Sequence, residues 1–124
     1  GGRIAGSIAR ARGAGDADLA AWAAALEEAV ARTVRTTRAL YAAGDMERAL
    51  AHATVYLEAF GHVVVAWIWL EQALAAQGRT GDFYDGKRQA CRYFFRWELP
   101  RTGAQFALLD SLDDTTLAMR DAWF

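Results

Sequence analysis

The stretch "AFGHVVVAWIWL", residues 59–70, would be apolar on every side of a helix. The fold therefore depends on which other parts of the protein cover this helix. Among these residues only His62 can carry a charge, and Glu58 and Glu71 stand on either side of the stretch. A helix that crosses a bilayer needs roughly 20 predominantly apolar residues, whereas a run of about 10 to 14 is more typical of a buried helix. We therefore predict no membrane span, and we expect protein to surround this helix.

The composition of the chain indicates a single all-α domain. It has 124 residues, of which 54% are hydrophobic, and one proline. This length is sufficient for one core that buries roughly two thirds of the unfolded surface. The formal net charge of −1 offers no attraction for nucleic acid or for an anionic membrane surface. The single cysteine, Cys91, excludes an internal disulfide and fits a reducing compartment, so we expect a cytoplasmic protein.

The first long helix is predicted from Asp16, a good N-cap residue, to the glycine at position 44. Small and apolar residues recur along it in steps of three and four, which is typical of a helix packed against antiparallel neighbours. Glu28 and Arg32 have the spacing of an ion pair within the helix. The predicted buried seam consists of Leu19, Trp22, Leu26, Ala29, Thr33, Thr36, Leu40 and Ala43.

The second long helix is predicted over residues 46–77, with Asp45 as its cap and Gly78 after its end. Its predicted seam consists of Met46, Leu50, Ala53, Leu57, Phe60, Val64, Trp67 and Leu74. Leu57 is accordingly expected in the core. Gly61, inside this helix, is interpreted either as a point of close approach or as a tolerated glycine.

The third long helix is predicted to begin after Asp82 as its cap, and Pro100 should kink or end it. Helical pattern continues through Phe106, Leu108, Leu109 and Leu112, and Trp123 and Phe124 could anchor a short terminal helix. The predicted fold is therefore an antiparallel bundle of three long helices with a short helix, residues 4–12, before them. We interpret residues 1–15 as a connection from an upstream catalytic region and residues 16–124 as the bundle domain.

Candidate chemistry is sparse along the sequence. Glu58, His62 and His52 could offer metal ligands from one helix, but a hydrogen-bonded histidine is the simpler interpretation. Cys91 is interpreted as an inert buried thiol, although neighbouring arginines could lower its pKa. The series Arg88, Arg92 and Arg96 could bind a phosphorylated ligand, but an ion-paired ridge explains it more simply. No glycine-rich phosphate loop or nucleophile elbow is present in the sequence.

Two stretches, "YLEAFGHVVVAWIWLEQALAA" and "DFYDGKRQACRYFFRWELPR", together resemble the extra C-terminal domain of the extended bacterial acyl-CoA dehydrogenases. The resemblance covers roughly residues 16–124 and is nearest to the branch that includes the methylmercaptopropionyl-CoA dehydrogenases. The residues that carry it are Tyr56, Leu57, Phe60, Gly61, Trp67, Gln72, Ala73, Phe83, Tyr84, Gly86, Lys87, Tyr93, Phe94, Leu99 and Pro100. The opening "GGR" is similar to the connection out of that family's flavin-binding bundle.

The resemblance implies a parent flavoprotein of fatty acid metabolism that removes two hydrogens from the Cα and Cβ of an acyl-CoA thioester. A glutamate would abstract the α-proton and FAD would accept the hydride. Those parts lie upstream in the family, so no catalytic, cofactor-binding or metal residue is assigned to this chain, and we expect it to be inactive alone. The implied partners are the catalytic domain of the same polypeptide, a second subunit and the acyl-CoA substrate of the parent.

The chain has more large apolar side chains than one small bundle can bury, and basic side chains beside them, which predicts an interaction surface. Residues expected at this interface are Trp69, Phe95, Trp97, Arg88 and Arg92, and Val63 is expected to add to the same surplus. The alternative function is a free-standing adaptor or small-ligand module. In that case an aromatic pocket would be lined by Trp67, Trp69, Phe94 and Trp97.

Overall fold

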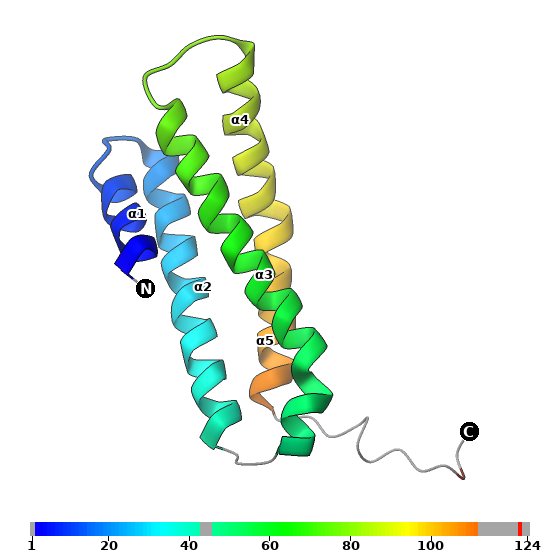
Figure 1. Ribbon diagram of the computed structural model, residues 1–124. Helices are drawn as coiled ribbons and strands as arrows, with labels where there is room; N and C mark the ends of the chain where they lie inside the picture. The colour runs from blue at the N-terminus through cyan, green and yellow to red at the C-terminus, as the bar shows by residue number, and fades with distance from the viewer. Residues whose placement is uncertain (1, 43–45, 112–121, 123–124) are drawn as a thin grey trace.

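Three antiparallel helical rods form the bundle shown in Figure 1, and a short helix lies along one end of it. The computed structural model describes residues 2–42, 46–111 and 122. The short helix is α1 (Gly2–Arg12), and the first two rods are α2 (Ala17–Ala42) and α3 (Met46–Ala76). The third rod joins α4 (Asp82–Tyr93), the π-helical turn η1 (Phe94–Glu98), the 3₁₀ turn η2 (Leu99–Arg101) and α5 (Thr102–Asp110). The predicted all-α bundle is confirmed.

Local signals explain most of the helix ends. The Asp16 carboxylate accepts hydrogen bonds from the backbone N–H groups two and three residues later, as an N-cap should. Gly15 and Gly78 have φ angles of 74° and 78°, a region that glycine enters without strain. The prediction that Asp82 caps α4 is wrong. Asp82 is instead the first residue of that helix, and the capping position belongs to Gly81 (φ 111°), which offers no side-chain acceptor.

The predicted seam of α2 is confirmed in the core. Because its apolar face is narrow and charged residues cover the other sides, only one rotation of the helix buries the apolar residues. The buried members are Leu19, Trp22, Leu26, Ala29, Thr33 and Thr36. Leu40 is half-buried, and Ala43, Gly44 and Asp45 lie outside the described residues.

The predicted seam of α3 is wrong by one position. Leu57 and Phe60 were expected in the core, but their exposed fractions are 65% and 44%. The buried residues are Ala59, Val63, Ala66, Leu70, Ala73 and Ala76. A shift of one residue along a helix changes the direction of the side chain by about 100°. Small residues on the buried face let neighbouring helices approach closely. The sequence could not distinguish these faces because the middle of α3 is apolar on all sides. The side chains of Met46 and Leu50 fall outside the described part of the chain.

Gly61 also differs from the close-approach interpretation. A Cβ placed on Gly61 would meet no atom within 4 Å, so this glycine faces open space in the described chain. Val65 and Ile68, one and two turns further along α3, are exposed as well. Among the described residues, the expectation that protein surrounds this helix is therefore met only in part.

The third rod changes its helical type just before Pro100. Pro100 lies in the 3₁₀ turn η2, because proline lacks a backbone N–H and its ring crowds the carbonyl group four residues earlier. Phe94 and Phe95 follow the buried Cys91 by three and four residues, so both lie on the buried face of the rod, at the start of the π-helical turn η1. Leu99, Phe106 and Leu109 then continue the buried face. The predicted disruption at Pro100 is confirmed, while Leu112, Trp123 and Phe124 lie outside the described residues.

Helix α1 packs on α2 and α3 and contributes to the core. Its buried residues are Ser7, Ile8 and Ala11. Arg12 donates two hydrogen bonds to Glu27 of α2, at 2.9 and 2.8 Å. This hydrogen bonding, with the opposite charges, raises the pKa of Arg12 and lowers that of Glu27. The assignment of residues 1–15 as a connection to an upstream region stays a prediction.

Candidate interaction surface

Exposed aromatic side chains line one side of α4 and η1. Phe83, Tyr93 and Trp97 are 69%, 55% and 63% exposed. With Gly86 and Ala90 between them they follow steps of three and four, so they share one side of the rod. We call Phe83, Tyr93 and Trp97 the aromatic edge. Large exposed aromatic groups of this kind are frequent at the centres of protein interfaces.

An open groove of about 590 Å³ runs beside the aromatic edge, between α3 and α4. Its lining residues are Trp69, Gly86, Gln89, Ala90, Tyr93 and Phe94. Gly86 leaves space here, because a Cβ at this position would meet no atom within 4 Å. The ammonium group of Lys87 lies 5.9 Å from the Trp69 ring centre and 5.3 Å from that of Phe83, within the range of cation–π attraction.

The predicted aromatic pocket is only partly assembled. Trp69 and Phe94 line the α3–α4 groove, whereas Trp67 lines a different groove, between α1 and α3, and Trp97 lines neither. The separation follows from the helical geometry of α3, since Trp67 and Trp69 are two positions apart and point about 160° away from each other. The structure therefore does not bring the four aromatic residues into one cavity.

Two residues expected at the surface belong to the core. Phe95 is buried and stacks on Trp22 of α2, with ring centres 6.0 Å apart, and Val63 is buried in α3. The assignment of Phe95 to the interface is corrected, because Phe95 lies four residues after the buried Cys91 and shares its face of the rod. Trp97, in the same turn, remains exposed.

The two arginines predicted at the interface make ion pairs inside the domain. Arg88 contacts Asp85 at 2.6 Å and donates hydrogen bonds to the carbonyl groups of Ala76 and Arg79, so it holds the turn between α3 and α4. Arg92 pairs with Asp18 at 2.8 Å and links α4 to α2. These contacts favour the ion-paired ridge over a phosphate site at Arg88 and Arg92. A further role of either arginine at an interface stays a prediction.

The sequence interpretation of Cys91 as an inert thiol agrees with its surroundings. Its side chain is completely buried, and burial raises the pKa of the thiol from 9.0 to about 12. The neighbouring Arg88 and Arg92 are engaged with Asp85 and Asp18. A protonated, buried thiol is a poor nucleophile.

We predict that folded Cys91 resists alkylation by iodoacetamide at pH 8 and reacts after denaturation. The unfolded thiol ionises at lower pH than the folded one, so the free energy of unfolding should fall as pH rises from about 9 to about 12. Mass spectrometry after timed labelling, with and without denaturant, measures the first effect. Equal labelling rates in both conditions would contradict it.

The metal-site hypothesis finds no support in the described part of the chain, where no group of three His, Cys, Asp or Glu side chains could hold an ion. His52 is buried, with its Nε2 atom lacking a described hydrogen-bond partner. His62 Nδ1 lies 2.9 Å from the Glu58 carbonyl oxygen, and its Nε2 lies 3.7 Å from Glu98. His62 is therefore hydrogen-bonded within α3, and its ring also lies against Phe94 and Glu98 of η1.

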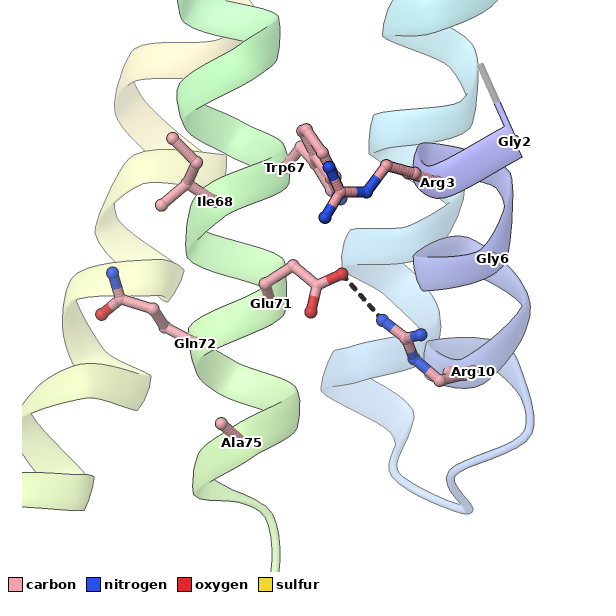
Figure 2. Close-up of a pocket in the computed structure, with 9 residues that line it drawn as sticks. All are labelled: Gly2, Arg3, Gly6, Arg10, Trp67, Ile68, Glu71, Gln72 and Ala75. Atoms are coloured by element: carbon pink, nitrogen blue, oxygen red, sulfur yellow. Dashed lines mark hydrogen bonds and ion pairs between the residues drawn. The ribbon is translucent and has the colours of Figure 1, made fainter.

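A second open groove, of about 640 Å³, lies between α1 and α3 (Figure 2). At its base the Trp67 indole N–H donates a hydrogen bond to the Ser7 hydroxyl at 2.8 Å, and that hydroxyl contacts the Glu71 carboxylate. Arg10 pairs with Glu71 at 2.7 Å, as the dashed line in Figure 2 shows. Ser7 carries no signal in the sequence, because a single serine among small and apolar residues acquires a role only when α1 packs against α3.

The apolar length of α3 also bears on membranes. Among the residues that the structure describes, one stretch, His52–Ala76, is long and apolar enough to cross a bilayer by length and composition alone. Of the 18-residue apolar segment within it, 22% is buried. One such helix is weak support for a span, since the core helix of a water-soluble protein passes the same test. The expectation of no membrane span stays a prediction.

The described residues form a helical bundle with an exposed aromatic edge. A family model described as acetyl-CoA dehydrogenase C-terminal like matches residues 2–120. The chain belongs to this family, which confirms the general resemblance to acyl-CoA dehydrogenase C-terminal domains. Searches of curated proteins and of solved structures returned no match.

Proposed function

We propose that this chain is the C-terminal structural and interaction domain of an FAD-dependent acyl-CoA dehydrogenase of the methylmercaptopropionyl-CoA dehydrogenase-like branch. The parent would be a cytoplasmic, bacterial, oligomeric enzyme that oxidises the Cα–Cβ bond of an acyl-CoA thioester. The observation that carries the proposal is the exposed aromatic edge on a domain of this family. An isolated bundle gains nothing from leaving these rings in water, whereas an interface would bury them.

The described residues do not fit a flavin dinucleotide. The α3–α4 groove offers Gln89 and Tyr93 as its polar side chains, and its other lining residues are apolar or small. A pyrophosphate group needs backbone N–H groups or paired cations around it. The α1–α3 groove is lined by Arg3 and Arg10, but Arg10 is already paired with Glu71, and the Glu71 carboxylate would repel a pyrophosphate group. FAD and the catalytic base are therefore assigned to the upstream catalytic part of the parent.

The aromatic edge supports docking to that catalytic part. A few aromatic and arginine residues usually carry most of the binding energy of an interface, and truncating such a residue costs roughly 2 kcal/mol or more. Trp97 is the natural anchor, since it is a large, exposed ring whose backbone lies in a packed helical rod. Tyr93 and Phe83 would extend the contact along α4.

We predict that Trp97→Ala in the full-length parent weakens attachment of this domain, whereas Trp97→Phe retains much of it. Limited proteolysis and thermal unfolding of the parent would report the attachment, and acyl-CoA-dependent dye reduction would report activity. Glu28→Ala, at an exposed position on α2, is the control. Deleting the whole domain should impair the parent more strongly than Trp97→Ala does.

Either of two results would contradict the proposal. Flavin absorbance retained by the purified 124-residue chain would contradict the assignment of FAD to the upstream part. A parent whose activity, stability and oligomeric mass are unchanged by removal of this domain would contradict the interaction role.

A further inference from the structure

An apolar strip on α2 and α3 continues beyond the region that α1 covers. The members of this strip with the greatest exposure are Val34 on α2 and Leu57 and Phe60 on α3. Tyr56 joins the two helices at this level, because its hydroxyl lies 2.7 Å from that of Thr37. We call Val34, Leu57 and Phe60 the α2–α3 strip.

Contacts at three levels show how α1 lies relative to α3. Ser7 meets Trp67, Arg10 meets Glu71, and the Ala14 carbonyl accepts a hydrogen bond from Gln77. Both helices therefore run in the same direction, with the N-terminal end of α1 nearest the middle of α3. In Figure 1, α1 lies along the end of the bundle near the turn between α3 and α4, and its N-terminal end points toward the other end.

The α2–α3 strip lies directly ahead of that N-terminal end. Tyr56 faces Thr37, and since α2 and α3 are antiparallel, one turn along each helix brings Phe60 to the level of Val34. Phe60 stacks on Tyr56, with ring centres 6.2 Å apart. Leu57 continues the strip away from α1.

One row of residues along α3 includes both the part that α1 covers and the exposed part in the α2–α3 strip. In steps of three and four, this row holds Ala53, Leu57, Phe60, Val64, Trp67, Glu71 and Leu74. Trp67 and Leu74 are partly buried and pack against the core, with Trp67 held by Ser7 of α1. Leu57 and Phe60, in the same row, are open to solvent. The row is thus covered only as far as α1 extends.

We propose that the segment immediately preceding α1 in the parent chain continues as a helix along the α2–α3 strip and buries it. This inference rests on the proposed function, because it requires a longer parent polypeptide. Ten residues of helix are about 15 Å long, which carries the chain past Phe60 and Leu57. The segment should place apolar residues toward the strip in steps that continue Ile4, Ile8 and Ala11. The same position would make it a rigid link between the catalytic part and the bundle.

Site-specific photocrosslinking in the full-length parent tests this placement. A benzoylphenylalanine residue at position 60, and separately at position 57, replaces a side chain that is already exposed, so both variants should fold. After irradiation, mass spectrometry should identify an intramolecular crosslink to the roughly 10 residues preceding Gly2. The same photoreactive residue at position 83, on the aromatic edge, is the matched control and should not label that segment.

Each other outcome overturns the inference in an identifiable way. A crosslink from positions 57 and 60 to a second subunit, to added lipid vesicles, or to nothing would exclude the segment as the occupant. A crosslink to a distant part of the catalytic region would overturn this placement but leave the proposed function standing. A gene product with no catalytic region upstream would overturn both. Equal labelling of the segment from position 83 would show that its contacts are nonspecific, which also overturns the placement.

Discussion

The Phe106→Ala variant is expected to lose roughly 3 to 5 kcal/mol of free energy of unfolding. Phe106 is 1% exposed and lies among the buried side chains of the core. Alanine would leave a cavity that three packed rods cannot close without moving. A domain of this size is typically stable by roughly 5 to 15 kcal/mol, so the loss is a large part of the total.

Urea unfolding of the 124-residue chain, followed by circular dichroism, measures this change. Phe83→Ala is the matched control, because it makes the same chemical change at a side chain that is 69% exposed. Its effect should stay within about 0.5 kcal/mol. Similar losses for the two variants would mean that Phe106 is not a core residue.

Leu70→Ala is expected to cost roughly 2 to 5 kcal/mol of the same free energy of unfolding. Leu70 is fully buried on the face of α3 that the core covers, whereas Leu57 is 65% exposed on another face of this helix. Leu57→Ala should therefore change the stability of the isolated chain by about 0.5 kcal/mol or less. The pair compares identical substitutions within one helix.

The denaturant midpoints of the two variants decide which face of α3 is buried. A larger loss for Leu57→Ala than for Leu70→Ala would restore the seam that the sequence predicts and would contradict the observed rotation of α3. In the full-length parent the outcome should differ, because the α2–α3 strip is then proposed to be covered. There Leu57→Ala should become measurably destabilising.

Two groups of exposed apolar side chains lie on separate parts of the bundle. The aromatic edge belongs to α4 and η1, and the α2–α3 strip lies on two other helices. The edge is proposed to dock on the catalytic part, and the strip to receive the chain that leads into α1. Two attachments would restrain the orientation of the bundle better than one, because a rigid body held at a single contact can still pivot.

The sequence by itself determined the helical class and several helix ends. Asp16, Gly15 and Gly78 act through hydrogen bonds and backbone angles that involve only neighbours in the chain. The face of α2 was predictable because apolar residues occupy one side of that helix. Pro100 disrupts the third rod for a reason that is equally local.

The candidate surface was only partly predictable. Trp97 was expected at an interface and is exposed, but Phe95 is in the core together with Cys91 and Phe94. Steps of three and four from Cys91 place Phe94 and Phe95 on one face, so helical spacing could have assigned Phe95 to the core. The aromatic residues on several faces of this stretch obscured that pattern.

Only the tertiary structure decided which face of α3 is buried and which charges meet. Arg32 has the spacing to pair with Glu28, yet it pairs with Asp110 of α5 at 2.9 Å, while Glu28 lies 3.5 Å from Arg35. Asp110 is 78 residues further along the chain and also accepts a hydrogen bond from Thr36. The spacing of residues in the sequence indicates only which side chains are neighbours within one helix. The rotation of α3 and the partner of Arg32 depend instead on how closely separate helices pack, and here small alanine side chains allowed a face that the larger apolar residues of α3 did not indicate.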